Sequence, residues 1–144
     1  MLSRYAAGER DFTSIGELPV DIGGMTLIGI DLSGTDLSER CLEKINLIGA
    51  NLSAASFFQA NLNCADLTGA DLYQANLEYY SIGAANLTGA DLTEASLINA
   101  QMGRSNLTGA NLTDANLTNA GLNEVNLTNA ILTGAILEGA RLAE

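Results

Sequence analysis

The sequence predicts a solenoid, a rod in which short repeats stack on one another, and two observations carry this prediction. Every residue whose number ends in 2 or 7, from Ile22 to Leu142, is large and apolar, which gives 25 such residues in one register. We call each of them the centre of its repeat. Two positions before the centre the chain holds Ala almost throughout Ala50–Ala140. The three exceptions are Tyr80, Ser105 and Val125. A period of five fits neither an α-helix nor a β-strand, so the repeat must be interpreted first.

The repeating unit is Ala-(Asn/Asp)-Leu-Thr-X, as in Ala85–Gly89 and Ala90–Glu94. With two inward and three outward residues, one unit can form one side of a coil. One side cannot bury its Leu alone, so coils must stack above and below it.

The motif resembles that of the pentapeptide repeat family, A(D/N)LXX, over about residues 20–144. The resemblance implies an all-β fold, a right-handed quadrilateral β-helix with four repeats per coil and about six coils. Residues 20 apart in the sequence would then stack. We therefore divide the chain into 1–19, an N-terminal helix cap with an irregular first coil, and 20–144, the β-helix.

The turns between repeats have their own signature. In Leu67–Ala70 the third residue needs a positive φ if the turn is type II, and Gly or Asn suits it. One side of the coil holds such residues at every level: Gly29, Gly49, Gly69, Gly89, Gly109 and Asn129. We expect type II turns there, and a different turn on the sides where Glu, Lys, Gln, Tyr or Arg takes this position.

The N-terminal segment predicts a short capping helix. Leu2–Ala7 has a helical composition and Gly8 can end the helix in the left-handed conformation. Such a helix would cover the open end of the solenoid. Asp11 and Phe12 follow as a first, degenerate repeat, and Pro19 would limit edge pairing. The segment has no apolar signal core, and no run of about 20 apolar residues occurs, so we expect a cytoplasmic protein without membrane contact.

The composition bears on several function classes. With 17 acidic and 6 basic residues the net charge is −11, which argues against direct nucleic-acid binding. Seven Asp residues stand immediately before a centre, where a short polar side chain can bond the local backbone. There is no His and no phosphate-binding loop, and no nucleophilic residue stands at a plausible catalytic spacing from a general base. Cys41 and Cys64 are better explained as ordinary substitutions at outward positions of the repeat than as members of a disulfide or a zinc site. We therefore expect no enzyme, cofactor or metal site.

One group of residues breaks the repeat in the middle coils. Phe58, Tyr79, Tyr80 and Ile98 converge on one corner of the predicted coil, and Glu78 shares their columns. We call these five residues the aromatic corner. An exposed apolar cluster rimmed by polar residues often marks a partner site. The alternative is local packing, with Tyr80 lying over Phe58.

The last repeats differ from the rest. Ile131 and Ile136 stand before a centre, where Asn or Asp is usual, and no lid-like helix or proline follows Leu142. We expect a homodimer through the C-terminal coil that relies on Ile131, Ile136 and Leu142. The alternative is that the isoleucines close the end of a monomer.

Two functional hypotheses follow. The favoured one is a non-enzymatic scaffold that binds an unidentified protein. The alternative is an acidic DNA mimic that binds DNA gyrase or another DNA-binding protein, since some pentapeptide repeat proteins are acidic rods of this kind. Against the alternative, the chain has no loop inserted between coils, and its surface acids form no two-rowed track.

Overall fold

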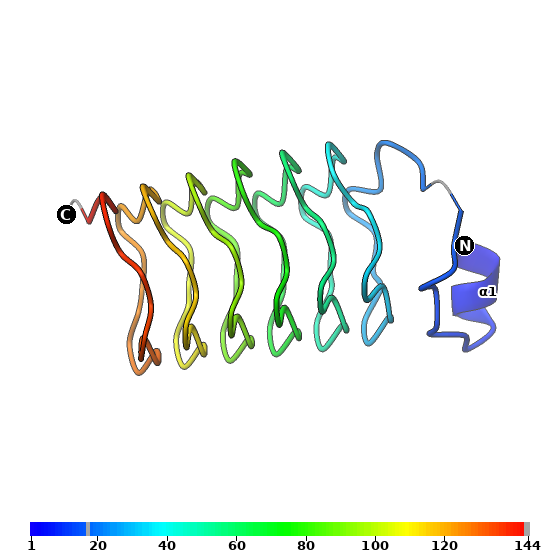
Figure 1. Cartoon of the computed structure of the whole chain (residues 1–144). Helices are drawn as coiled ribbons and strands as arrows, with labels where there is room; N and C mark the ends of the chain where they lie inside the picture. Colours follow the sequence, from blue (N-terminus) through cyan, green and yellow to red (C-terminus); the bar gives the residue numbers. More distant parts are fainter. Residues whose placement is uncertain (17, 143–144) are drawn as a thin grey trace.

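The chain forms a rod of stacked coils with the N-terminal helix at one end and the C-terminus at the other (Figure 1). The structure is a computed structural model that describes residues 1–16 and 18–142. Its helix, α1, spans Leu2–Ala6. In the described residues the coils pair through single-residue bridges, and no longer strand is formed.

The bridges are parallel and join residues 20 apart, from Asp11 with Asp31 to Gly121 with Arg141. The bridging residue stands directly before a centre. Its neighbours carry the hydrogen bonds: the N–H of Leu87 donates to the carbonyl of Asn106 at 2.7 Å, and the N–H of Asn106 donates to the carbonyl of Ala85 at 2.9 Å. Four repeats of five residues therefore make one coil, with a separate ladder of bridges on each of its sides.

The core is a stack of the two inward residues of each repeat. The centres, such as Leu87 and Leu92, and the small residues before them, such as Ala90 and Ala100, are fully buried in the middle coils. This confirms the inward positions that the register predicts. Burying one Leu side chain contributes about 1.5–3 kcal/mol, and only stacked coils can bury it.

The turns correct one expectation. From Gly24 to Gly139 every residue two positions after a centre has a positive φ, including Gly69 at 62°, Tyr79 at 55° and Arg104 at 64°. The prediction of a different turn on the sides without Gly is wrong. The reason is that this residue's N–H also bonds the next coil, as when Tyr79 donates to Ile98 at 3.0 Å. Stacking imposes one corner geometry and overrides a residue preference of about 1–2 kcal/mol.

The polar residues before the centres have the structural role that the sequence predicts. Oδ1 of Asp71 accepts the N–H of Tyr73 at 2.9 Å, and Oδ1 of Asp91 accepts the N–H of Thr93 at 3.0 Å. Hydrogen bonds of the same kind hold the pKa of Asp36 below its usual value, because its carboxylate accepts them from the hydroxyl and the backbone N–H of Ser38. These side chains fix the start of each turn.

The N-terminal segment is anchored to the first coils. Helix α1 ends at Ala6, one residue earlier than expected, and Gly8 has a φ of 95°. The hydroxyl of Tyr5 donates to the carbonyl of Ile28 at 2.9 Å. Phe12 is fully buried, which confirms the degenerate first repeat.

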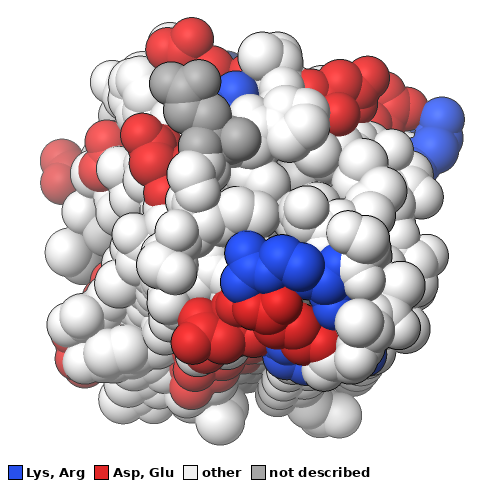
Figure 2. Space-filling model, turned by 90° about the vertical axis from the view of Figure 1, so that its right-hand side faces the viewer, with Lys and Arg blue, Asp and Glu red and all other residues white. Residues whose placement is uncertain are grey.

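Basic and acidic side chains lie side by side on this end of the rod (Figure 2), where Arg4 pairs with Glu9. Within residues 1–16 and 18–142, no helix has the length and hydropathy that a membrane span needs.

Candidate functional site

The aromatic corner brings residues of successive coils together at the surface. The rings of Phe58 and Tyr79 meet edge to face, with centroids 5.9 Å apart and planes inclined by 70°. Phe58 is half-buried, whereas Tyr79 keeps 56% of its surface exposed. The predicted meeting of these two residues is confirmed.

Tyr79 occupies an unfavourable place for an aromatic residue. Its φ of 55° lies in the left-handed region, which bulky side chains rarely adopt. At the other left-handed turn positions the chain has Gly, Asn or another non-aromatic residue. Since most of the ring faces solvent, burial offsets little of this conformational cost. Stacking imposes the left-handed φ at this corner as at the others, so what sets Tyr79 apart is its aromatic side chain.

Tyr80 is not part of the surface, which corrects its inclusion in the predicted contact set. It stands two positions before the centre Ile82, an inward position, and only 1% of it is exposed. It therefore cannot contact a partner, and the ring that covers Phe58 is that of Tyr79. In the described part of the chain its hydroxyl has no hydrogen-bond partner, and burial raises its pKa well above the usual value.

Glu78 and Ile98 complete the exposed part of the corner. Both are half-buried, and Oε1 of Glu78 accepts the hydroxyl of Ser96 at 2.8 Å. The sequence has no Lys or Arg between Lys44 and Arg104. The ion pairs that the described residues form lie outside the corner. The corner is therefore an apolar surface beside an acidic group with no basic residue near it in the sequence.

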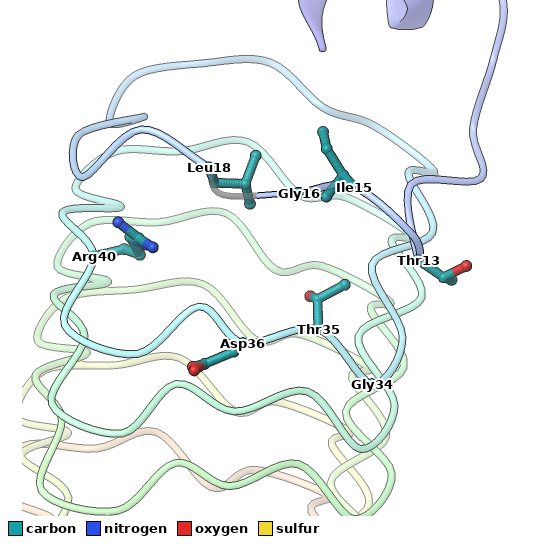
Figure 3. A pocket seen from close by; sticks show the side chains of 8 residues that line it. All are labelled: Thr13, Ile15, Gly16, Leu18, Gly34, Thr35, Asp36 and Arg40. Carbon is teal, nitrogen blue, oxygen red and sulfur yellow. The ribbon is translucent and has the colours of Figure 1, made fainter.

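A second feature is a cavity of about 410 Å³ near the N-terminal end (Figure 3). One wall carries Thr13, Ile15, Gly16 and Leu18, and the other carries Gly34, Thr35, Asp36 and Arg40. Arg40 takes an inward position, which holds Ala in most of the middle coils, and among the described residues its buried Nε has no partner. Sequence reasoning missed this cavity. Its one signal is an arginine at an inward position that most later coils give to Ala.

The C-terminal coil exposes its apolar residues. Ile131, Ile136 and Leu142 are 49%, 48% and 67% exposed, and Leu137, which was not predicted, is exposed as well. Cys41 is half-buried and Cys64 exposed, and both are free thiols. In the described ranges no three His, Cys, Asp or Glu side chains gather closely enough to hold a metal ion.

Comparisons with family models and with solved structures give matches of the same kind. The family model described as pentapeptide repeats matches in eight copies, over residues 20–53, 41–78, 85–122 and 110–144. A pentapeptide repeat protein from the thylakoid lumen of Arabidopsis thaliana is 35% identical, with 72% of this chain and 77% of that chain covered and a TM-score of 0.66. Curated protein sequences give no significant match.

Two cyanobacterial structures are less similar. Rfr23 of Cyanothece 51142 is 26% identical, with 99% of this chain and 97% of that chain covered and a TM-score of 0.45. HetL of Nostoc sp. strain PCC 7120, a protein involved in heterocyst differentiation regulation, is 27% identical, with 98% and 94% covered and a TM-score of 0.30. The family-model matches and the Arabidopsis structure, together with the 20-residue coil, show that this chain belongs to the pentapeptide repeat family.

Proposed function

We propose that the chain is a non-enzymatic scaffold, a right-handed quadrilateral β-helix that binds another protein through Phe58, Glu78, Tyr79 and Ile98. The observation that supports this proposal most is the position of Tyr79, an aromatic ring that is 56% exposed on a left-handed turn residue. The other described turn positions hold Gly, Ala, Cys or a polar residue, so an exposed aromatic ring is the exception there. Exposed Tyr residues are enriched among the groups that dominate protein interfaces.

The neighbours of Tyr79 suit a protein contact. Phe58 supports the Tyr79 ring edge-on, which holds it in place before a partner arrives. Ile98 extends the apolar surface into the next coil, and Glu78 supplies an acidic rim. A rigid aromatic anchor with a polar rim loses little conformational entropy on binding.

The test replaces Tyr79 by a photo-crosslinking phenylalanine analogue and compares it with the same replacement of Tyr73. Tyr73 is also exposed but lies on another side of the same coil. We expect a cross-linked partner at position 79 and none at position 73. The variant Tyr79→Ser should then lose at least about tenfold in affinity for that partner, the effect of removing a hot-spot aromatic residue, whereas Tyr73→Ser should not.

The opposite outcome would identify the corner as local packing. If Tyr79→Ser lowers the melting temperature and leaves binding unchanged, Tyr79 serves to cover Phe58 and the contact surface lies elsewhere.

The DNA-mimic alternative has one observation in its favour, the absence of any basic residue between Lys44 and Arg104. Against it, the carboxylates of Asp71 and Asp91 are held by turn N–H groups and do not project freely. A DNA gyrase supercoiling assay separates the two functions. No inhibition at a large molar excess of the protein eliminates the mimic.

The compartment stays a prediction. We propose that the chain works in the cytoplasm. The Arabidopsis relative comes from a thylakoid lumen, so members of this family also occur elsewhere. Fractionation of the source cell followed by immunodetection tests this placement.

A further inference from the structure

Each corner of the rod is closed by one backbone hydrogen bond within the turn, and one described corner lacks it. The bond runs from the N–H of the inward residue to the carbonyl of the centre three positions before it, as from Ala60 to Phe57 at 2.9 Å. It is present at every described corner with an inward residue from Met25 to Ala140 except one. There, the N–H of Tyr80 makes no bond to the carbonyl of Leu77 or to any other described residue. The turn from Leu77 to Tyr80 is therefore open.

The length of this turn bond follows the size of the inward side chain. Where the inward residue is Ala, the bond measures 2.9–3.1 Å, apart from 3.3 Å at Ala85, which forms the next corner after Tyr80. The bond lengthens to 3.4 Å at Met25 and at Arg40, and to 3.3 Å at Val125. Tyr80 is the largest fully buried side chain of the rod, and its corner has no bond. An oversized side chain in a close-packed interior shifts the backbone around it, so we attribute the open turn to the Tyr80 ring.

The hydrogen bonds between coils are also longest beside Tyr80. The N–H of Gln59 donates to the carbonyl of Glu78 at 3.2 Å, whereas the equivalent bonds on this side of the rod measure 2.8–3.0 Å. The N–H of Ser81 donates to the carbonyl of Ala60 at 3.2 Å, and its equivalents again measure 2.8–3.0 Å. Both bonds join the coil of Tyr80 to the coil before it. The segment from Glu78 to Ser81, which includes the exposed ring of the aromatic corner, therefore stands further from that coil than its counterparts do.

The open turn and the exposed aromatic ring occur at the same corner. Tyr80 buries a backbone N–H and a hydroxyl that have no partner among the described residues, and unpaired buried groups of this kind lower stability. Ala takes the same position in the coils before and after it, at Ala60 and Ala100. The described corner with the fewest hydrogen bonds is thus the one that displays Tyr79. This coincidence links an interior residue to the surface that we assign to a partner.

We propose that Tyr80 is a positioning residue for the aromatic corner: its buried ring holds the turn open and thereby sets the place of the Tyr79 ring. The role in partner binding rests on the proposed function, whereas the effect of Tyr80 on the turn and on the neighbouring ring belongs to the free protein. A corner without its turn bond moves more easily than a closed one. Tyr79 can therefore adjust to a partner while Phe58 of the coil before supports its ring.

The first experiment measures by NMR how the amide-proton shifts of the free protein depend on temperature, because an amide without a hydrogen bond shifts more steeply. In wild type the amide of Tyr80 should shift more steeply than those of Ala60 and Ala100. Tyr80→Ala should bring residue 80 into line with these two, and Tyr80→Phe, which keeps the ring, should not. Tyr80→Met fills more of the interior than Ala and should give an intermediate value, as the long bond at Met25 indicates.

Two outcomes of this measurement overturn the proposal. An amide at residue 80 that stays steep in both Tyr80→Ala and Tyr80→Met would show that the inward ring does not open the turn. A turn that closes in Phe58→Ser would assign the opening to the surface ring pair instead. The place of the Tyr79 ring is then followed by nitration of exposed tyrosines with tetranitromethane, with Tyr73 as the internal reference. Tyr80→Ala should slow the nitration of Tyr79 relative to Tyr73, and an unchanged ratio overturns the positioning role.

The second experiment uses the partner that cross-links at position 79. Tyr80→Ala should lower the affinity for this partner at least about threefold, and Tyr80→Phe should restore it. Tyr79→Ser should then cost less affinity in the Tyr80→Ala background than in wild type, because the ring is no longer held in place. Strictly additive effects of the two substitutions overturn the positioning role. If no partner cross-links at position 79, the proposed function fails, and the amide and nitration results still decide whether Tyr80 sets the corner.

Discussion

Tyr79 and Tyr80 are adjacent in the chain and have opposite surroundings, with 56% of Tyr79 exposed and 1% of Tyr80. The five-residue register explains this contrast, because Tyr79 takes the turn position and Tyr80 the inward position before the centre Ile82. Tyr80 thereby places a phenol ring in a column that holds Ala60 below it and Ala100 above it. Its buried hydroxyl has no partner in the described part of the chain.

The first prediction is that Tyr80→Phe stabilises the fold. A buried polar group without a hydrogen bond costs about 1–3 kcal/mol, and Phe removes the hydroxyl while keeping the ring. We expect the free energy of unfolding in urea to rise by about 1 kcal/mol. Tyr79→Phe is the matched control and should change it little. A loss of stability in Tyr80→Phe would mean that the hydroxyl bonds a buried water molecule.

The second prediction concerns alkaline pH. Burial raises the pKa of Tyr80 well above 10.0 in the folded state, whereas the unfolded chain ionises it near the ordinary value. The unfolded state therefore releases a proton first, so the contribution is complete below the unfolded pKa and is lost as pH rises toward the folded pKa. Urea unfolding between neutral pH and alkaline pH should show a steeper loss for wild type than for Tyr80→Phe. Parallel curves for the two proteins would refute this role of Tyr80.

The sequence predicted the parts of the fold that depend on the register. The coil of four repeats was implied by the family resemblance, and the buried Ala100 and the turn bonds of Asp71 follow from the five-residue repeat itself. The turn at Tyr79 could not be predicted from the repeat, because its left-handed φ is imposed by the hydrogen bond to the next coil and contradicts the residue's own preference. The cavity beside Arg40 could not be predicted either, because it depends on side-chain packing against the irregular first coil.

The third prediction tests the inward column. Ala100 is fully buried one coil away from Tyr80, so Ala100→Leu should overpack the interior and destabilise the fold by about 1–3 kcal/mol. Thr108→Ser on an outward position of another side should change little. Thermal unfolding of both variants checks this, and equal melting temperatures would contradict the inward assignment.

The fourth prediction concerns the polar residues before the centres. Asp71→Ala removes the acceptor for the N–H of Tyr73 and should destabilise the fold by about 0.5–1.5 kcal/mol. Asp71→Asn keeps an oxygen acceptor and removes one of two like charges, since Asp71 bridges with Asp91. The free energy of unfolding of Asp71→Asn in urea should therefore equal or exceed that of wild type, most clearly at low salt. An Asn variant as unstable as the Ala variant would show that the negative charge itself is required.

The fifth prediction isolates the backbone strain at the turns. Ala84 has a φ of 55° and an exposed side chain, so Ala84→Gly relieves a left-handed residue without removing a buried contact. Gly69 has a φ of 62°, and a Cβ added there would meet no atom within 4 Å, so Gly69→Ala adds strain without a clash. Left-handed strain is about 1–2 kcal/mol, and the greater freedom of Gly in the unfolded chain offsets part of it. We expect stability changes of about 0.5–1 kcal/mol, upward for Ala84→Gly and downward for Gly69→Ala. If Ala84→Gly destabilises the fold instead, stacking has relaxed that corner and the strain does not exist.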